Sequence, residues 1–216
     1  MKERDTVAVD DVVHAVTTGG VAVIPTDTVY GLVCDPGNAA AVDRIYAIKR
    51  RPADLELTLL AATYAEVEAI VELSEVARLL ALHYWPGPLS IIAELRGRNL
   101  AIPRSGRTLS CRVPRRISAL HLLSLTGALA STSANRHGEP PATTAAEARH
   151  RLGGEVDAIL DDGPSAGVAS TIIDCTATPP RVLREGPISA GELSAFLGGA
   201  DLPGAGTLPR PESSEG

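Results

Sequence analysis

Short apolar runs alternate with stretches of helical periodicity along most of this chain, and that alternation limits the folds open to it. The expected strands cover residues 21–25, 57–62, 89–95, 109–113, 128–131, 158–160, 171–174 and 182–183. The expected helices cover residues 10–18, 38–49, 66–83 with a break near Ser74, 118–125 and 144–152, and a last helix follows Ser189. Strands interleaved with helices indicate an α/β layered domain, and we expect a mixed sheet.

Local signals mark several of the helix ends. Thr144 with Glu147 and Ser189 with Glu192 have the spacing of a capping box, in which the hydroxyl and the carboxylate satisfy free backbone N–H groups. The pair Gly19-Gly20 is typical of the end of a helix.

Size and composition favour one domain. A chain of 216 residues with 44% hydrophobic residues can bury one substantial core. We expect this domain to cover residues 1–198, and residues 199–216, mostly Gly, Pro, Ser and Glu, to form a disordered tail. No apolar run approaches the roughly 18 residues of a membrane span, so we expect a cytoplasmic protein with buried, reduced cysteines.

Charge limits the possible ligands. The net charge of −6 argues against a protein whose whole surface grips nucleic acid. Local basic clusters occur at residues 49–51 and 115–116. A solvated surface remains an equally good reading of each cluster taken alone.

Familiar catalytic motifs are absent from the sequence. It has no GxxxxGK[ST] loop, no GxGxxG fingerprint, no serine in a nucleophile elbow and no histidine spacing that indicates a protein metal site. Polar residues instead follow or interrupt the expected strands, at 26–28, Arg112, 131–135, 170–171 and Arg184. Each has a structural explanation by itself. Together they predict a site that binds a phosphate-bearing anion and stabilises charge without a covalent intermediate.

Several ordered motifs resemble those of the YrdC/TsaC-type threonylcarbamoyl-AMP synthases. The run IPTDTVYGL at 24–32 is similar to the family's PTDTVYGL signature, KRRP at 49–52 matches its KxRP element, and SAN at 133–135 matches its SxN element. Four further segments fall in the family's order, at 84–89, 111–114, 170–173 and 183–186. The resemblance covers residues 10–198 and is closest to the short form of the family.

The resemblance implies a twisted mixed sheet flanked by helices around a concave basic cavity, the YrdC-like fold. It also implies synthesis of threonylcarbamoyl-AMP and pyrophosphate from ATP, L-threonine and bicarbonate, with Mg²⁺ on the phosphates. A threonylcarbamoyl-transferase complex would then transfer the threonylcarbamoyl group to tRNA.

Site residues follow from the resemblance by position. Those implied to bind ATP are Lys49, Arg51, Thr108, Ser133, Asn135 and Arg184, and those implied to bind threonine are Thr28, Arg112, Ser131 and Ser170. Lys49 and Arg51 would neutralise charge as the catalytic residues. We expect Lys49 at the exposed end of a surface helix, so that its replacement by alanine should leave the fold intact.

Two positions depart from the family pattern, and two other functions remain possible. Glu56 stands where many members have proline, and Leu60 where they have histidine, which affects the details of the threonine pocket. The alternatives are a non-catalytic relative that binds double-stranded RNA or tRNA, and a relative that handles carbamoyl-AMP.

Overall fold

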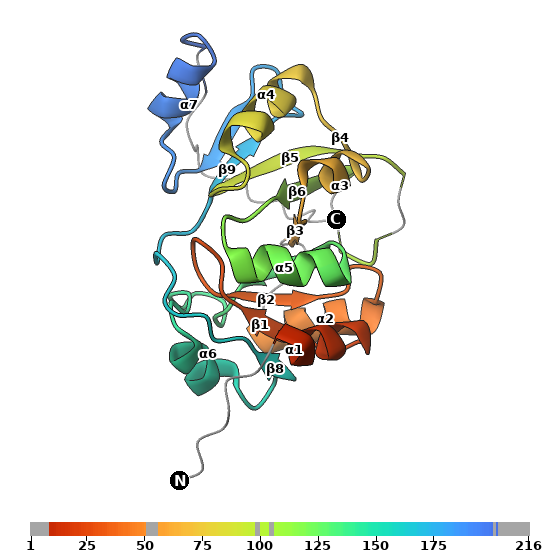
Figure 1. Cartoon of the computed structure of the whole chain (residues 1–216). Helices are drawn as coiled ribbons and strands as arrows, with labels where there is room; N and C mark the ends of the chain where they lie inside the picture. Colours follow the sequence, from red (N-terminus) through yellow and green to blue (C-terminus); the bar gives the residue numbers. More distant parts are fainter. Residues whose placement is uncertain (1–8, 51–55, 98–99, 104–105, 201, 203–216) are drawn as a thin grey trace, which may run out of the picture.

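The computed structural model describes residues 9–50, 56–97, 100–103, 106–200 and 202 of the chain (Figure 1). The described helices are α1 (Val9–Thr17), α2 (Ala39–Lys49), α3 (Tyr64–Glu68), α4 (Glu75–Tyr84), α5 (Ile117–Thr126), α6 (Ala145–Leu152) and α7 (Ala190–Phe196). The described strands are β1 (Ala22–Ile24), β2 (Gly31–Cys34), β3 (Thr58–Leu60), β4 (Val71–Glu72), β5 (Leu89–Leu95), β6 (Thr108–Arg112), β7 (Leu129–Ser133), β8 (Ala158–Ile159), β9 (Thr171–Asp174) and β10 (Arg181–Arg184).

The helix ends confirm the local signals in the sequence. The hydroxyl oxygen of Thr144 accepts a hydrogen bond from the Glu147 N–H, and Ser189 caps α7 in the same way. The predicted break near Ser74 is also confirmed, because this serine caps α4. The stretch before it differs from the prediction, since it forms the short helix α3 and then strand β4.

All ten strands of the described residues belong to one mixed sheet. Nine lie side by side in the order β10-β9-β5-β6-β3-β7-β2-β1-β8. β4 pairs with β5 without being part of this order. The pairs β3–β6, β5–β9 and β1–β8 are parallel, whereas the other pairs are antiparallel. β3 lies between β6 and β7, which come much later in the chain. The predicted twisted mixed sheet is therefore confirmed, although β2 and β4 are absent from the predicted strands.

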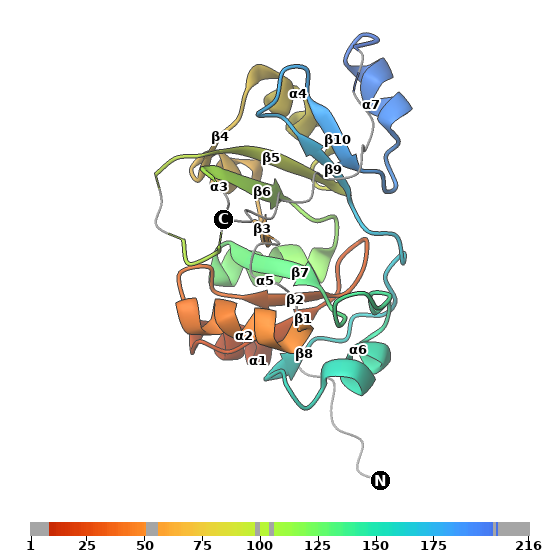
Figure 2. The ribbon, with the colours of Figure 1, turned by 180° about the vertical axis from the view of Figure 1, so that it is seen from behind.

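Helices cover the two faces of the sheet unequally (Figures 1 and 2). The larger core cluster joins one face of the sheet to buried residues of α2, α3, α4, α6 and α7. A smaller cluster joins the opposite face to α1 and α5, over strands β1, β2, β3, β7 and β8. Helices α1 and α5 therefore cover only one end of the second face. At the other end, strands β5, β6, β9 and β10 contribute no residue to this cluster.

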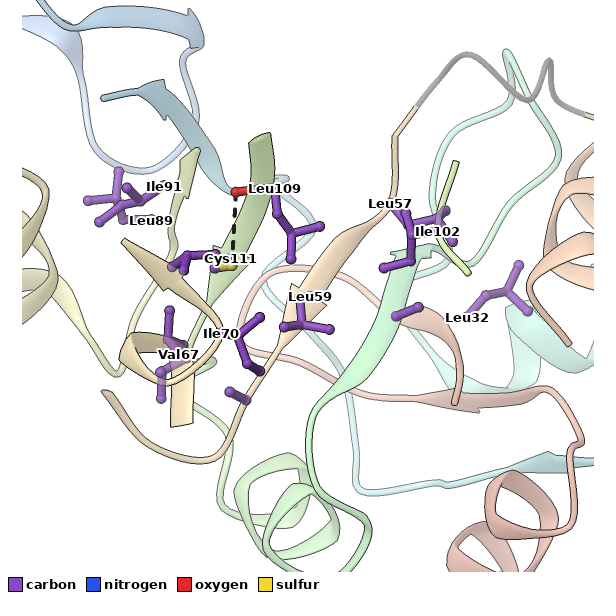
Figure 3. Close-up of a cluster of buried hydrophobic side chains, with 14 of the residues drawn as sticks. Leu32, Leu57, Leu59, Val67, Ile70, Leu89, Ile91, Ile102, Leu109 and Cys111 are labelled. Carbon is purple, nitrogen blue, oxygen red and sulfur yellow. Dashed lines mark hydrogen bonds between the residues drawn. The ribbon is translucent and has the colours of Figure 1, made fainter. Parts of the chain in front are cut away.

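The larger cluster is built from alternate residues of the central strands (Figure 3). Leu59 of β3, Ile91 of β5, and Leu109 and Cys111 of β6 are all fully buried there. The Cys34 thiol is also buried, and burial raises its pKa to about 12, so it is protonated at neutral pH. All three cysteines are free and buried, as predicted.

The sequence predicts a domain that ends at residue 198 and contains no membrane span. Leu202 belongs to the larger core cluster and is 8% exposed. The remainder of the expected tail beyond Ala200 lies outside the described residues, so the domain boundary stays a prediction. Of the helices that the structure describes, none has the length and apolarity that a membrane span requires.

Candidate functional site: a cavity on the open face of the sheet

A cavity of about 320 Å³ lies on the sheet face that carries α1 and α5. Its lining combines hydroxyl groups, two arginines, one carboxylate and a few apolar side chains. The described lining residues are Thr26, Thr28, Val29, Gly31, Thr58, Leu60, Ser90, Arg112, Ser131, Thr132, Ser133, Asn135, Glu139, Pro141, Ala169, Ser170, Ile172 and Arg184. This volume and this polarity suit a small polar ligand.

Strand pairing places polar side chains in a row across the cavity floor. Thr58 of β3 lies opposite Ser110 of β6 on one side and Ser131 of β7 on the other. The Thr58 and Ser110 hydroxyl oxygens are 3.0 Å apart. Because side chains alternate along a strand, Ser131 and Ser133 share this face. β7 continues through Ser133, so these serines lie inside the strand, whereas the sequence analysis ends it at residue 131.

The turn between β1 and β2 forms one wall of the cavity. The buried Thr26 hydroxyl donates to the Val29 carbonyl at 2.6 Å, and its oxygen lies 3.0 Å from that of Thr28. Since Thr26 has used its only hydroxyl proton, Thr28 is the donor in the second bond. Thr28 also accepts a hydrogen bond from Arg112, so its hydroxyl can only accept from a ligand.

Arg112 is buried at the end of β6 and is held from three directions. Its Nε donates to the Gly87 carbonyl at 2.9 Å, one Nη donates to Thr28 at 2.9 Å, and the other forms an ion pair with Asp27 at 2.5 Å. Burial lowers the pKa of the guanidinium, Asp27 opposes that shift, and Arg184 adds to it, but an arginine remains charged. A guanidinium has five N–H groups, so these bonds leave two for a ligand.

Arg184 reaches the same cavity because of an irregularity in β10. Val182 pairs with Ile173 and Arg184 pairs with Ile172, so two steps along β10 match one step along β9. Such a bulge turns the residue beyond it to the other face of the sheet. Nε of Arg184 donates to the Ser170 carbonyl at 3.0 Å, and one Nη donates to the Ser170 hydroxyl at 3.2 Å.

The two arginines differ in their electrostatic surroundings. Arg112 is paired with Asp27, whereas no ion pair joins Arg184 to a carboxylate of the described residues. Burial lowers the pKa of Arg184 as well. The cavity therefore has an arginine whose charge is balanced by the protein and another with positive charge available to an anion.

Lys49 differs from the sequence expectation. It ends α2 and is only 2% exposed. Its ammonium donates to the Ser133 carbonyl at 2.7 Å, to the Asn135 carbonyl at 2.9 Å and to the Asn135 side-chain oxygen at 3.2 Å. The expectation of an exposed residue that contributes little to the fold is wrong, because the lysine side chain turns inward and stabilises residues 133–135 at the end of β7.

The other predicted site residues are distributed as follows. Thr28, Arg112, Ser131, Ser133, Asn135, Ser170 and Arg184 all line the cavity. Thr108 lies at the opposite end of β6 from Arg112 and is not in the described lining. Arg51 lies outside the described residues. Leu60, which departs from the family pattern, contributes to the cavity wall next to Arg112, its partner across β3 and β6.

The predicted ATP-binding and threonine-binding residues do not include every residue of the site, and Ser90, Asp27 and Glu139 are among those that they omit. Ser90 lines the cavity, and its hydroxyl oxygen is 2.9 Å from that of Ser170. Asp27 holds Arg112, and Glu139 contributes a carboxylate to the lining. Ser90 carries a signal, since it is a polar residue within the apolar run 89–95. The sequence gives no comparable signal for the partners of Asp27.

The fold and the cavity define an α/β protein with an open site for an anionic small molecule. A model of the Sua5/YciO/YrdC family, described as "Telomere recombination", matches residues 14–186. The chain therefore belongs to the Sua5/YciO/YrdC family, as the sequence motifs indicate.

Individual relatives agree with this assignment. A protein from Idiomarina loihiensis named "Threonylcarbamoyl-AMP synthase" is 39% identical over 165 residues, which cover 74% of this chain and 89% of the relative. The crystal structure of P. abyssi Sua5 complexed with L-threonine matches with a TM-score of 0.84 and 32% identity, over 91% of this chain and 58% of that chain. The crystal structure of E. coli YciO matches with a TM-score of 0.76 and 30% identity, over 83% of this chain and 89% of that chain.

Proposed function

We propose that this protein is a threonylcarbamoyl-AMP synthase, a nucleotidyltransferase that uses ATP, L-threonine and bicarbonate and releases pyrophosphate. The observation that supports this function best is the pairing of two unlike arginines across one hydroxyl-lined cavity. Arg112 suits a carboxylate, and Arg184 suits a phosphate. The names of the relatives favour the synthase over a non-catalytic RNA-binding protein or a carbamoyl-AMP-handling relative.

The threonine end of the site is proposed to lie at Arg112. Its two remaining N–H groups can donate to the amino-acid carboxylate, and an arginine fork binds such a group with defined geometry. Because the Thr28 hydroxyl has no proton left to donate, it would accept from the amine or the hydroxyl of threonine. Ser131 and Ser170 would complete this end of the pocket.

The nucleotide end is proposed to lie toward Arg184, Ser133 and Asn135. Arg184 retains N–H groups for phosphate oxygens and has no acid partner among the described residues. Lys49 would act here by holding the 133–135 segment in place, and its ammonium lies behind that segment. The roles of Arg51 and Thr108 in ATP binding stay predictions from the family motifs.

The chemistry needs orientation and charge stabilisation more than a nucleophilic side chain. The amine of threonine adds to CO₂ derived from bicarbonate, and a carbamate oxygen then attacks the α-phosphorus of ATP. The bond from that phosphorus to the bridging oxygen breaks, and pyrophosphate leaves with the electron pair. Fixed guanidinium and hydroxyl groups lower this barrier by holding the reacting anions together and stabilising the developing charge.

Mg²⁺ is proposed to enter with the nucleotide. No group of three potential metal-ligating side chains occurs in the part of the chain that the structure describes. The cavity lining offers the Glu139 carboxylate and several hydroxyls. That donor set fits a Mg²⁺ ion that is bound mainly through the phosphates of ATP and its own waters. When bound, the ion would neutralise charge on the phosphates.

The product is proposed to serve tRNA modification in the cytoplasm. Threonylcarbamoyl-AMP is an activated acyl donor, so a threonylcarbamoyl-transferase complex acting on tRNA would consume it.

A product assay tests the proposed function. Purified protein is incubated with ATP, Mg²⁺, L-threonine and bicarbonate, while pyrophosphate and the mass of the nucleotide product are measured. We expect both pyrophosphate and threonylcarbamoyl-AMP, and each should require threonine and bicarbonate. Absence of both products from folded protein that still binds tRNA would support the RNA-binding alternative.

A conservative variant links this activity to the cavity. Arg112→Lys keeps the positive charge but loses the planar fork, so the KM for threonine should rise by roughly tenfold or more while the KM for ATP changes little. An unchanged threonine dependence would contradict the role given to Arg112.

A further inference from the structure

We infer that Asp27 is a positioning residue that fixes Arg112 for a carboxylate and keeps phosphate away from that end of the cavity. This inference rests on the proposed function, because it assigns one end of the site to the amino-acid substrate. Asp27 would act through Arg112 without touching the reacting atoms.

Asp27 joins two segments that are far apart in the sequence. Its Oδ1 atom accepts a hydrogen bond from an Nη of Arg112 at 2.5 Å and another from the backbone N–H of Arg115 at 2.8 Å. The side chains of Asp27 and Arg112 are 15% and 5% exposed. One carboxylate oxygen therefore ties the β1–β2 turn to the segment that follows β6, with the guanidinium between them.

The other contacts of Arg112 make this orientation specific. Gly87 holds Nε, and Thr28 holds the second Nη. Thr28 is itself fixed, because its proton is donated to Thr26, whose own proton is donated to Val29. The guanidinium cannot rotate without breaking several of these bonds, and Asp27 supplies the charged bond among them. Two N–H groups thus remain in fixed directions.

The charge of Asp27 also affects which anion can bind at Arg112. The Arg112–Asp27 pair is neutral overall, and the charge of Asp27 repels a polyphosphate more strongly than a singly charged carboxylate, which can use the remaining N–H groups. Arg184 lies close enough to lower the pKa of Arg112 and has no carboxylate partner among the described residues. Without the charge of Asp27, Arg112 would resemble Arg184 and attract phosphate. Asp27 would therefore determine which arginine takes which anion.

The test is Asp27→Asn, which removes the charge and changes the side-chain shape little. Threonine binding is measured by calorimetry without ATP, first alone and then with added inorganic phosphate. We expect the Kd for threonine to rise by roughly tenfold, as for the loss of one charge-assisted hydrogen bond, and the KM for threonine to rise with it. We also expect phosphate to compete with threonine in the variant and not in the wild type. A purely structural role would not create this competition.

Asp162→Asn is the matched control. Asp162 forms an ion pair with Arg116, and its carboxylate is not in the cavity lining. The same change of charge at this position should leave threonine affinity and phosphate sensitivity as they are in the wild type. A similar rise in the threonine Kd in both variants would show a general charge effect and overturn the inference.

The outcomes separate this inference from the proposed function. If Asp27→Asn is folded by circular dichroism and binds threonine as the wild type does, the inference is overturned and the synthase function stands. If that variant does not fold, Asp27→Glu keeps the charge but moves it, and should weaken threonine binding several-fold without phosphate competition. Wild-type threonine affinity in Asp27→Glu would then overturn the positioning role. A wild type that neither binds threonine nor makes product would refute the proposed function, and this inference with it.

Discussion

Neighbouring residues in the central strands face two different environments. Ile91 and Cys111 point into the larger core cluster and are fully buried there. Ser90 and Arg112, each one position away, line the cavity on the opposite face. Apolar side chains on one face of these strands thus stabilise the sheet. The other face can therefore carry polar groups that contribute little to the core. The difference shows how this sheet supports a charged site without a separate domain.

The first way to test this comparison is to remove a side chain from the core face. Ile91→Ala should lower the free energy of unfolding by about 2–5 kcal/mol, because it leaves a cavity in a fully packed cluster. Urea unfolding measures this loss, and the slope of the transition shows whether it remains two-state. A loss below about 1 kcal/mol would mean that this face does not hold the strands as described.

Lys49 lies between the two environments, and its replacement should affect both stability and activity. Lys49→Met leaves the Ser133 and Asn135 acceptors without their donor, so we expect a loss of about 1–3 kcal/mol in the free energy of unfolding. Product formation should also be abolished, because the 133–135 segment lines the site. The unfolding midpoint and the pyrophosphate assay measure the two effects.

A control for this variant comes from the same helix. Asp43 is exposed on α2, so Asp43→Ala should leave both stability and product formation nearly unchanged. If Lys49→Met is as stable as the wild type, the hydrogen bonds of Lys49 do not stabilise the fold, as expected from the sequence.

Ser90→Ala tests the cavity face of β5. It removes the hydrogen bond to Ser170, which should cost about 1 kcal/mol of stability, much less than Ile91→Ala next to it. The KM for threonine should rise measurably because Ser170 loses a partner. A stability loss as large as that of Ile91→Ala would mean that both faces of β5 contribute equally to the free energy of unfolding.

The smallest effect is expected away from the cavity, at the ion pair of Asp162 with Arg116, in the acid dependence of stability. The Ser118 hydroxyl, followed by the Arg116 guanidinium, lowers the pKa of Asp162. A carboxylate with a lowered pKa contributes stability above its unfolded pKa and loses it as the pH falls through the folded value. Asp162→Asn should therefore flatten the decline in stability below about pH 4. Parallel curves of the melting temperature against pH for wild type and variant would contradict this.

The parts of the fold that depend on local physics are predictable from the sequence. Side-chain caps at Thr144 and Ser189 occur where the spacing of hydroxyl and glutamate indicates them, and the helix break predicted near Ser74 coincides with a cap at that serine. Strands β5, β6 and β9 lie close to the predicted ranges 89–95, 109–113 and 171–174, because apolar residues recur within each of these segments. β2 is absent from the predicted strands because it begins at Gly31 and follows the polar turn at 26–28. It is recognised as a strand only by its pairing with β1 and β7.

The candidate site is predictable in its residue types but less so in its geometry. The polar interruptions at Arg112, Ser131 and Ser133 indicate an anion site, and the structure brings these residues to one cavity. The inward turn of Lys49 is not predictable, because its acceptors come from a segment more than 80 residues later. The ion pair of Arg112 with Asp27 likewise joins residues 85 positions apart.

The alternation of helices and strands, the helix caps, the family and the chemical types in the site are readable from the chain alone, because each depends on short-range periodicity or on an ordered set of motifs. The strand order, the burial of Lys49, the pairing of Arg112 with Asp27 and the face on which Arg184 lies depend on contacts between distant segments. Arg184 shows why: the β10 bulge is defined only by its pairing with β9, and it turns a residue that simple alternation would place on the core face. Charge balance in this protein is a property of such long-range contacts.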